Sequence, residues 1–473
     1  MINFAHVPAR YVFTFVAMLG LMMSYSMRSC LSLAITRMVT PSNTTHSSRT
    51  ELFNSSSNKC ETFNWNEKTQ GLILSAFYWG YFITHIPGSS LSQKFGGKYT
   101  FGLGILCTAS FTVLTPLVVD NDPMILMIIR FVEGIGEGMV FPALYILLAQ
   151  WAPPGEKGVM STFIFLGSQI GTCLSNIVGG YILEYAPGCA WKLVFYVFGS
   201  CGIIWYVLWQ FLCYNDPLSH PFISEEEKMY LQKELGCIQR KKTLKTTPWK
   251  HILTSVPIWA LVIAEFGHDW GVYVVIADLP KFVNDVLKFN PAETGMMSGF
   301  PYLSVIVASF ISSFLNDWIT RNEILSKDVL RKMFTTISSV GPAIGMLCAS
   351  YMATKTTVSL CFIFGMGTLA FSYSSLKINA LDVSPNYAGS IMAVVNGVGC
   401  IAGVLAPYFV GLITTHRSVE EWRLVFWIMA SVLVLTNFIF VIFGSTELEQ
   451  WDDPDRNDEK CMLSEIESCG SSA

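Results

Sequence analysis

The stretch MILMIIRFVEGIGEGMVFPALYILLAQW, residues 124–151, is long and apolar enough to cross a lipid bilayer, yet it contains Arg130, Glu133 and Glu137. Each ionised side chain near the middle of a membrane helix costs about 2.5–3.5 kcal/mol on insertion scales. A chain keeps such groups when they are paired or turned toward a polar interior. This segment therefore predicts a bundle of membrane helices that encloses the three charges.

Helical spacing brings these three side chains together. At about 100° per residue, positions i, i+3 and i+7 fall within roughly 60° of one another on one helix face. Glycines at positions 134, 136 and 138 stand among the charged residues and allow a neighbouring helix to approach closely. A buried salt bridge that only joins two helices is the alternative, but it needs one carboxylate and the segment carries two. We therefore favour a functional site.

The composition of the whole chain supports a membrane protein. Of 473 residues, 52% are hydrophobic and only 14% are charged, which no ordinary soluble domain shows. We expect an all-α polytopic protein with two six-helix halves, residues 1–213 and 254–444, joined by a charged cytoplasmic connection, 214–253, and followed by a disordered tail, 445–473. The twelve expected spans are 10–38, 69–92, 99–119, 124–151, 158–182, 190–213, 254–282, 294–315, 331–352, 357–379, 389–413 and 422–444.

The distribution of basic residues predicts the orientation. Lysines and arginines gather in 93–98, 214–253 and 316–332, which all fall on one side of the membrane, and the positive-inside rule makes that side cytoplasmic. Both termini are then cytoplasmic. Within the connection, SEEEKMYLQKEL (224–235) predicts a short amphipathic surface helix that begins with a capping box formed by Ser224 and Glu227.

The loop 39–68 then faces the exterior or a lumen. Its sequons at Asn43 and Asn54 predict glycosylation there. Cys60 and Cys189 both lie on the outer side, where they either pair or remain free like the other cysteines.

Two further spans carry ionisable side chains. Arg28 lies about ten residues, or roughly 15 Å, from the outer end of the first span, so we expect an inward-facing contact with an anion rather than snorkelling to the interface. In the seventh span, His268 stands beside Glu265 and Asp269. It either handles protons or substrate in the interior or serves only as a hydrogen-bonded contact between helices.

Other polar positions have weaker signals. Tyr78 and Tyr273 offer a ring and a hydroxyl to a cavity, although tyrosine is also a common interfacial residue. His85 and Pro87 indicate a kink in the inner half of the second span. At the end of the tenth span we expect gate or cap contacts from Asn379 and Asp382, and a snorkelling Lys377.

No catalytic or nucleotide-binding motif is present in the sequence. It contains no GxxxxGK[ST], GxSxG or HExxH pattern and no cysteine–histidine cluster. We therefore expect neither an enzyme nor an ATP-driven pump, and no cofactor or metal. The expected partners are the bilayer and a small anionic solute, with no nucleic acid, and the expected state is a monomer.

Five segments together are similar to those of solute-carrier family 17, in the major facilitator superfamily. They are FYWGYFITHIPG (77–88), RFVEGIGEGMVFPA (130–143), WAPPGEK (151–157), GHDWGVYVVIADLPKF (267–282) and NALDVSPNYAG (379–389). The family includes sialin, the vesicular glutamate transporters and sodium–phosphate cotransporters. The resemblance implies an anion carrier that works by alternating access, with its substrate site midway between the halves.

The resemblance also implies roles for individual residues. Arg28 matches an arginine implied in anion binding, and Arg130 and Glu137 match a charged pair of the fourth span. Glu133 resembles an extra carboxylate of the sialin branch, which favours proton coupling through Glu133 and Glu137. His268 occupies the position of a substrate arginine in the glutamate carriers.

Two departures, Leu74 and Ala380, replace histidines and argue against glutamate as the substrate. The resulting prediction is a proton-coupled organic-anion symporter in the plasma membrane or in an endolysosomal or vesicular membrane. The alternatives are a sodium-dependent phosphate cotransporter and, more remotely, a nontransporting sensor with a transporter fold.

Overall fold

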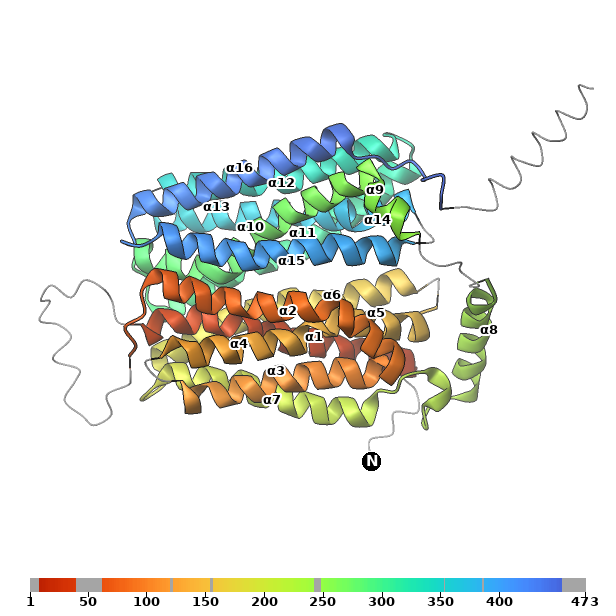
Figure 1. The fold of residues 1–473 in the computed structure, drawn as a ribbon, viewed down its shortest axis with the longest axis horizontal. Coiled ribbons are helices and arrows are strands. Elements are labelled where there is room, and N and C mark those ends of the chain that lie inside the picture. Colours follow the sequence, from red (N-terminus) through yellow and green to blue (C-terminus); the bar gives the residue numbers. More distant parts are fainter. Residues whose placement is uncertain are drawn as a thin grey trace, which may run out of the picture.

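In a computed structural model, the chain forms a bundle of long helices (Figure 1). The structure describes residues 8–39, 62–119, 122–153, 156–241, 248–352, 354–384 and 387–452. Within those ranges the extended pairing is a single isolated bridge between Val39 and Phe63. We call the end of the bundle where the first helix begins the inner end, following the predicted orientation, and the opposite end the outer end.

The described residues of the first half form seven helices, which lie in the lower part of Figure 1. They are α1 (Ala9–Met38), α2 (Glu67–Phe95), α3 (Gly97–Val118), α4 (Pro123–Gly138), α5 (Val140–Trp151), α6 (Lys157–Tyr185) and α7 (Ala190–Leu212). The connection contributes η2 (Pro217–Ser219), α8 (Glu225–Lys241) and α9 (Trp249–Thr254).

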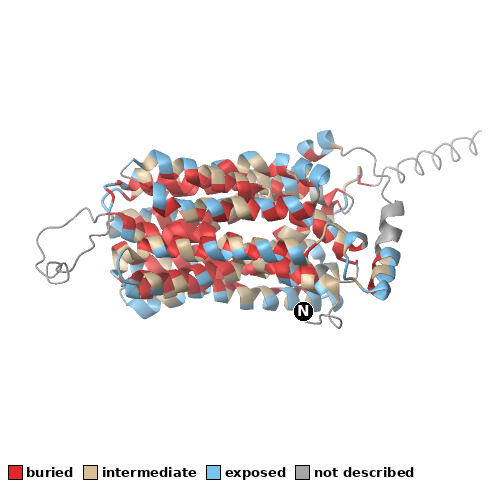
Figure 2. Cartoon of the chain, turned by 90° about the horizontal axis from the view of Figure 1, so that it is seen from below, coloured by how far each residue is buried: buried red, intermediate tan, exposed pale blue. Residues whose placement is uncertain are grey.

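The second half fills the upper part of the same view. It contains α10 (Val256–Leu287), α11 (Pro291–Arg321), α12 (Lys327–Tyr351), α13 (Lys355–Leu369), η3 (Ala370–Ser374), α14 (Leu376–Val383), α15 (Ala388–Ile413) and α16 (Val419–Phe443). Exposed residues lie around the outside of both halves (Figure 2). Many of them are large apolar side chains, as expected where lipid replaces water.

Ten helical segments of the described chain are long and apolar enough to cross a membrane. The other two expected spans correspond to α2 and to the consecutive helices α4 and α5. The layout therefore fits the twelve-span prediction. The span predicted over 124–151 consists of two consecutive helices, because α4 ends at Gly138 and α5 starts at Val140.

A proline explains this break. Pro142 has no N–H to donate, and its ring is directed against the carbonyl of the residue four positions earlier, which is Gly138. The backbone N–H of Met139 turns instead to the Glu137 carbonyl. The regular helix is thus interrupted two residues after Glu137.

The tenth span is interrupted as well. Between α13 and α14 the chain tightens into the 3₁₀-helix η3, and Ser375 adopts φ −124° and ψ −82°. The Ser375 hydroxyl donates to the Phe371 carbonyl. Serine side chains compete in this way for the backbone bonds of a regular helix.

Glycines allow α4 to pack directly against its neighbours, as the sequence predicts. A side chain at Gly134 would meet the Phe77 carbonyl of α2, and one at Gly136 would lie 2.7 Å from the Gly104 carbonyl of α3. Such backbone contacts let small residues bring membrane helices close together. They hold α4 directly against α2 and α3.

The predicted capping box of α8 is only half formed. The Glu227 N–H donates to the Ser224 hydroxyl at 3.2 Å, but the Glu227 carboxylate turns away to the start of α1. There it accepts from the Ala9 N–H at 2.7 Å and from the Arg10 N–H at 3.2 Å. The Arg10 guanidinium also forms an ion pair with Glu156, with 2.9 Å between Arg10 Nε and Glu156 Oε2. The expected surface helix is therefore anchored to the first half.

Three predictions concern the outer loop. Asn43, Asn54 and Cys60 lie outside the described residues. Cys189, at the start of α7, is disulfide-bonded.

We predict that Gly134→Ala destabilises the protein, whereas Gly271→Ala does not. The added methyl at 134 overlaps a backbone carbonyl that cannot move aside, which costs about 1–3 kcal/mol. At 271, in the middle of α10, the methyl makes ordinary contacts with Leu433 at 3.4 Å or more. Thermal unfolding of the two purified variants in detergent measures the difference, and equal melting temperatures would contradict the packing argument.

Candidate functional site

The guanidinium of Arg28 lies in a box of aromatic rings. Arg28 is 5% exposed. Its Cζ atom is 4.8 Å from the Tyr78 ring centre, 5.1 Å from Phe77 and 5.3 Å from Tyr273. The rings of Tyr25 and Tyr81 complete the box at 5.2 and 5.5 Å. Each ring face attracts a cation, so the box compensates part of the lost hydration of Arg28.

This box is built from both halves of the protein. Tyr78 comes from α2 and Tyr273 from α10, and their ring centres are 4.7 Å apart in an edge-to-face arrangement. Close packing of Gly403 of α15 against the Tyr78 ring supports the contact from behind. The two tyrosines predicted to line an interior site therefore meet there, at the boundary between the halves.

Arg28 has an incomplete set of partners. Its Nη1 atom lies 3.6 Å from Glu137 Oε1, which is an ion pair but is too long for a hydrogen bond. The Nε and Nη2 atoms of Arg28 and both carboxylate oxygens of Glu137 are buried without a hydrogen-bond partner. A buried charged group normally satisfies its hydrogen-bonding capacity. The pair therefore retains capacity for a ligand or a proton.

In the neighbouring ion pair, Arg130 with Glu133, both carboxylate oxygens of Glu133 accept hydrogen bonds. Arg130 Nη1 donates to Glu133 Oε2 at 2.6 Å, and the Thr112 hydroxyl of α3 donates to the other oxygen of Glu133 at 3.0 Å. Arg130 Nη2 also contacts the Arg28 carbonyl at 3.4 Å. Of the three charges predicted to share a face, two thus pair with each other, and Glu137 turns to Arg28.

A second cluster of ionisable groups lies in the other half. Lys377 of α14 pairs with the fully buried Glu265 of α10. His268 Nε2 is 3.2 Å from the Ser372 hydroxyl, and His268 Nδ1 has no partner. The expectation that Lys377 snorkels to the interface was wrong, because its ammonium group points into the bundle toward Glu265.

One hydrogen bond joins this cluster to the first half. The Gln169 amide of α6 donates to the Tyr373 hydroxyl of η3 at 2.8 Å. His268 thus lies near a contact between the halves, but its ring contacts Ser372 rather than Arg28.

The predicted gate residues occupy the inner end. Asp382 accepts from Arg331 Nε at 2.8 Å, and Arg331 Nη1 also donates to the Asn316 side chain and the Ser374 carbonyl. Asn379 donates to the Ser445 carbonyl at 3.2 Å. These contacts stay within the second half and tie α11, α12, η3 and α14 together.

The remaining two predicted residues lie on α2. The His85 ring is buried beside the Tyr81 ring, 5.6 Å between centres. Pro87 is exposed and lies inside α2, whose helical assignment continues to Phe95. The predicted kink at this proline stays a prediction.

A charged network at the outer end escaped the sequence analysis. Arg417, between α15 and α16, pairs with Glu67 of α2 at 2.7 Å, and Lys281 of α10 lies 3.7 Å from both Glu67 and Asp278. The spacing of Asp278 and Lys281 by three residues within an apolar span was the available signal. The network joins the two halves at the outer end.

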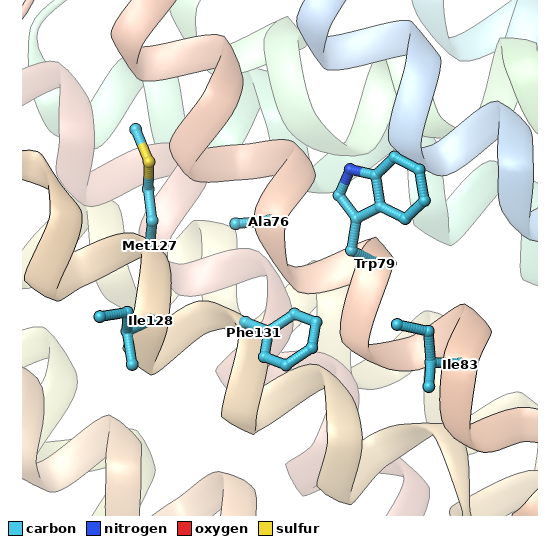
Figure 3. Close-up of a pocket in the computed structure, with 6 residues that line it drawn as sticks. All are labelled: Ala76, Trp79, Ile83, Met127, Ile128 and Phe131. Carbon is cyan, nitrogen blue, oxygen red and sulfur yellow. The ribbon is translucent and has the colours of Figure 1, made fainter.

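A groove of about 310 Å³ lies between α2 and α4 (Figure 3). Only apolar residues line it, namely Ala76, Trp79, Ile83, Met127, Ile128 and Phe131. Because it offers no polar contact, it does not suit an anion, and the charged interior remains the candidate site.

Comparison with known proteins identifies the superfamily of the chain and several relatives that match it along most of its length. Residues 15–407 match the model of the Major Facilitator Superfamily. Human sialin is 34% identical over 94% of this chain and 90% of its own length. A Drosophila melanogaster protein designated an inorganic phosphate cotransporter is 33% identical, over 96% of this chain and 88% of its own length. Vesicular glutamate transporter 3 of Danio rerio is 32% identical, over 96% and 76% respectively.

Solved structures show the same fold. A bacterial homologue of the human lysosomal transporter Spinster aligns with a TM-score of 0.71 at 13% identity, covering 93% of this chain and 98% of its own. The xylose transporter XylE of E. coli aligns with a TM-score of 0.67 at 15% identity, covering 92% and 96%.

We predict that Thr112→Val lowers thermal stability more than Thr115→Val. Both hydroxyls are buried within hydrogen-bonding distance of a carbonyl of their own helix, but only the Thr112 hydroxyl is also within reach of Glu133, at 3.0 Å, and can give its one proton to that carboxylate. Removing that bond leaves a buried charged oxygen unsatisfied, at a cost of about 1–3 kcal/mol. Thermal unfolding in detergent measures both variants, and equal losses would show that Thr112 does not support Glu133.

Proposed function

The chain belongs to solute-carrier family 17 of the major facilitator superfamily, and on this premise we propose that it carries an organic anion across a membrane together with protons. The observation that supports the proposal most is the incomplete pair of Arg28 and Glu137. A cation with free donor atoms, enclosed by rings from both halves, is suited to bind an acid group between those halves.

Competition for Arg28 would couple the anion to a proton. A substrate carboxylate and an ionised Glu137 would both face the same guanidinium, and two like charges close together in a site of low dielectric repel strongly. Protonation of Glu137 removes that repulsion and releases Arg28 to the substrate. By linkage, a bound anion then favours the protonated carboxyl by the same free energy.

The two glutamates would have different parts in this cycle. Glu133 is held by Arg130 and Thr112, so a proton on it would displace two existing contacts. Glu137 accepts no hydrogen bond of regular geometry, although the Ser24 hydroxyl lies beside it, and it meets Arg28 only at 3.6 Å. We therefore place the transported proton on Glu137 and assign Glu133 to keeping Arg130 close to the Arg28 carbonyl.

Alternating access would expose this site to each side in turn. The outer network between Glu67, Lys281 and Arg417 holds the halves together at the outer end and would have to open during the cycle. An acidic compartment supplies the proton gradient that the mechanism uses. We therefore place the protein in a vesicular or lysosomal membrane, with both termini in the cytoplasm.

Sodium-dependent phosphate transport is the second candidate, supported by the 33% identity to the Drosophila protein designated an inorganic phosphate cotransporter. Uptake of labelled phosphate and labelled sialate into proteoliposomes separates the two. Proton coupling predicts uptake that follows an imposed pH gradient and persists when choline replaces sodium. Loss of uptake in choline would favour the sodium-dependent phosphate cotransporter.

We predict that Glu137→Gln abolishes pH-driven uptake and retains substrate exchange. The amide cannot release a proton, but it resembles the protonated carboxyl in shape and leaves Arg28 free for the anion. Gradient-driven uptake should fall by about tenfold or more, because the coupled protonation equilibrium is lost. Counterflow without a pH gradient should continue.

The matched control is Glu184→Gln, at an exposed position near the end of α6. It should leave both activities unchanged. Normal pH-driven uptake by Glu137→Gln would exclude Glu137 as the proton carrier.

A further inference from the structure

The seam between α6 and α11 joins the two halves through close backbone contacts. A side chain at Gly295 of α11 would meet the Asn176 carbonyl of α6, and one at Gly299 would lie 3.1 Å from the Cys173 carbonyl. The two edges of this seam differ. Phe300 on α11 is exposed at one edge, whereas the residues of α11 at the other edge are buried. The buried edge therefore faces the interior between the halves.

Three hydroxyl groups line the buried edge of the seam. Thr294, Ser298 and Tyr302 recur every four residues, so they follow one side of α11 over about 12 Å. Thr294 lies close to the start of α11, at the outer end. The Tyr302 hydroxyl is within electrostatic range of Tyr78 and Arg28. These three side chains, which we call the hydroxyl stripe, thus lead from the outer end to the Arg28 box.

The hydroxyl stripe is buried without partners. Each of its side chains is at most 3% exposed, and none of its hydroxyls has a hydrogen-bond partner among the described residues. Elsewhere on α11, Ser309 and Ser312 donate to carbonyls of their own helix. Across the seam, Asn176 Oδ1 is unpartnered too, so α6 does not satisfy the stripe. Buried polar groups without partners cost free energy, and we expect another state of the protein to use them.

We propose that the hydroxyl stripe is a second binding site for the transported anion, which occupies it on the way between the outer end and Arg28. This inference rests on the proposed function and adds a step to it. Hydroxyl groups donate to the oxygens of a carboxylate or a phosphate, and they replace the water that the anion loses when it enters the bundle. Because the stripe carries no charge, it holds the anion less tightly than Arg28 does and passes it on.

Chemical modification from the outer side tests whether the anion occupies the stripe. In sealed vesicles whose exposed face is the outer one, a membrane-impermeant sulfonated thiol reagent should modify Ser298→Cys but not Ser309→Cys. Cys173→Ser removes the native thiol of the seam from both proteins. Saturating sialate or phosphate, each added separately, should slow the modification at 298. The protection should persist when Arg28→Gln is added, because the stripe is a site of its own.

Removal of the hydroxyls separates a binding role from a structural one. Because the hydroxyls have no partner in the closed seam, Thr294→Val and Ser298→Ala should each keep or raise the melting temperature. Uptake at low anion concentration should nevertheless fall about two- to tenfold for each lost hydroxyl, the factor that one hydrogen bond supplies. The matched control is Ser309→Ala on the same helix, where the hydroxyl already has a partner, and its uptake should be normal.

The outcomes separate this inference from the proposed function. Failure of the reagent to reach Ser298→Cys from the outer side would overturn the inference, and so would protection that disappears with Arg28→Gln. Normal uptake by both Thr294→Val and Ser298→Ala would overturn it as well. Absence of pH-driven uptake by the unmodified protein would count against the proposed function instead, because modification and protection at 298 do not depend on a proton gradient.

Discussion

The placement of Arg28 in the interior is the constraint on which the rest of the structure depends. A guanidinium cannot lose its proton in a protein, so its charge must be compensated wherever it is buried. Here the compensation comes from Glu137 on α4 and from rings on α1, α2 and α10. These contacts require α4 to come close to α2. The glycines at 134 and 138 of α4 make that approach possible.

The two interrupted spans have equivalent places in the two halves. Each is the fourth span of its half, and each carries a charged residue within two positions of the break: Glu137 before Met139, and Lys377 after Ser375. Discontinuous helices in corresponding positions of the two halves are typical of substrate sites in transporters. The irregular backbone is tolerated because it faces the interior, where partners other than lipid satisfy its polar groups.

The sequence was sufficient to predict the elements that depend on local pattern. Long apolar runs predict the helices, and the charge stripe of residues 130–137 predicts which helix faces inward. Arg28, Tyr78 and Tyr273 could be singled out because polar groups in a span are rare. Their meeting point could not, since it depends on the packing of α1, α2 and α10.

Other features of the site had a weak local signal or none. Thr112 resembles any other span threonine until its hydroxyl is seen against Glu133. Lys377 lies near a span end, where snorkelling is the usual outcome, and only the position of Glu265 shows why it points inward. The break at Met139 was readable in principle from Pro142, but a proline inside an apolar run often leaves a membrane helix continuous.

The anchoring of α8 changes how the two halves are joined mechanically. By the number of residues alone, the chain between α7 and α10 would be a long flexible connection between the halves. Because Glu227 binds the first backbone N–H groups of α1, and Arg10 holds Glu156 in turn, that connection is fixed to the first half partway along its length. The stretch of chain that spans from the first half to the second therefore begins at Glu227 rather than at the end of α7, and one carboxylate determines where it begins.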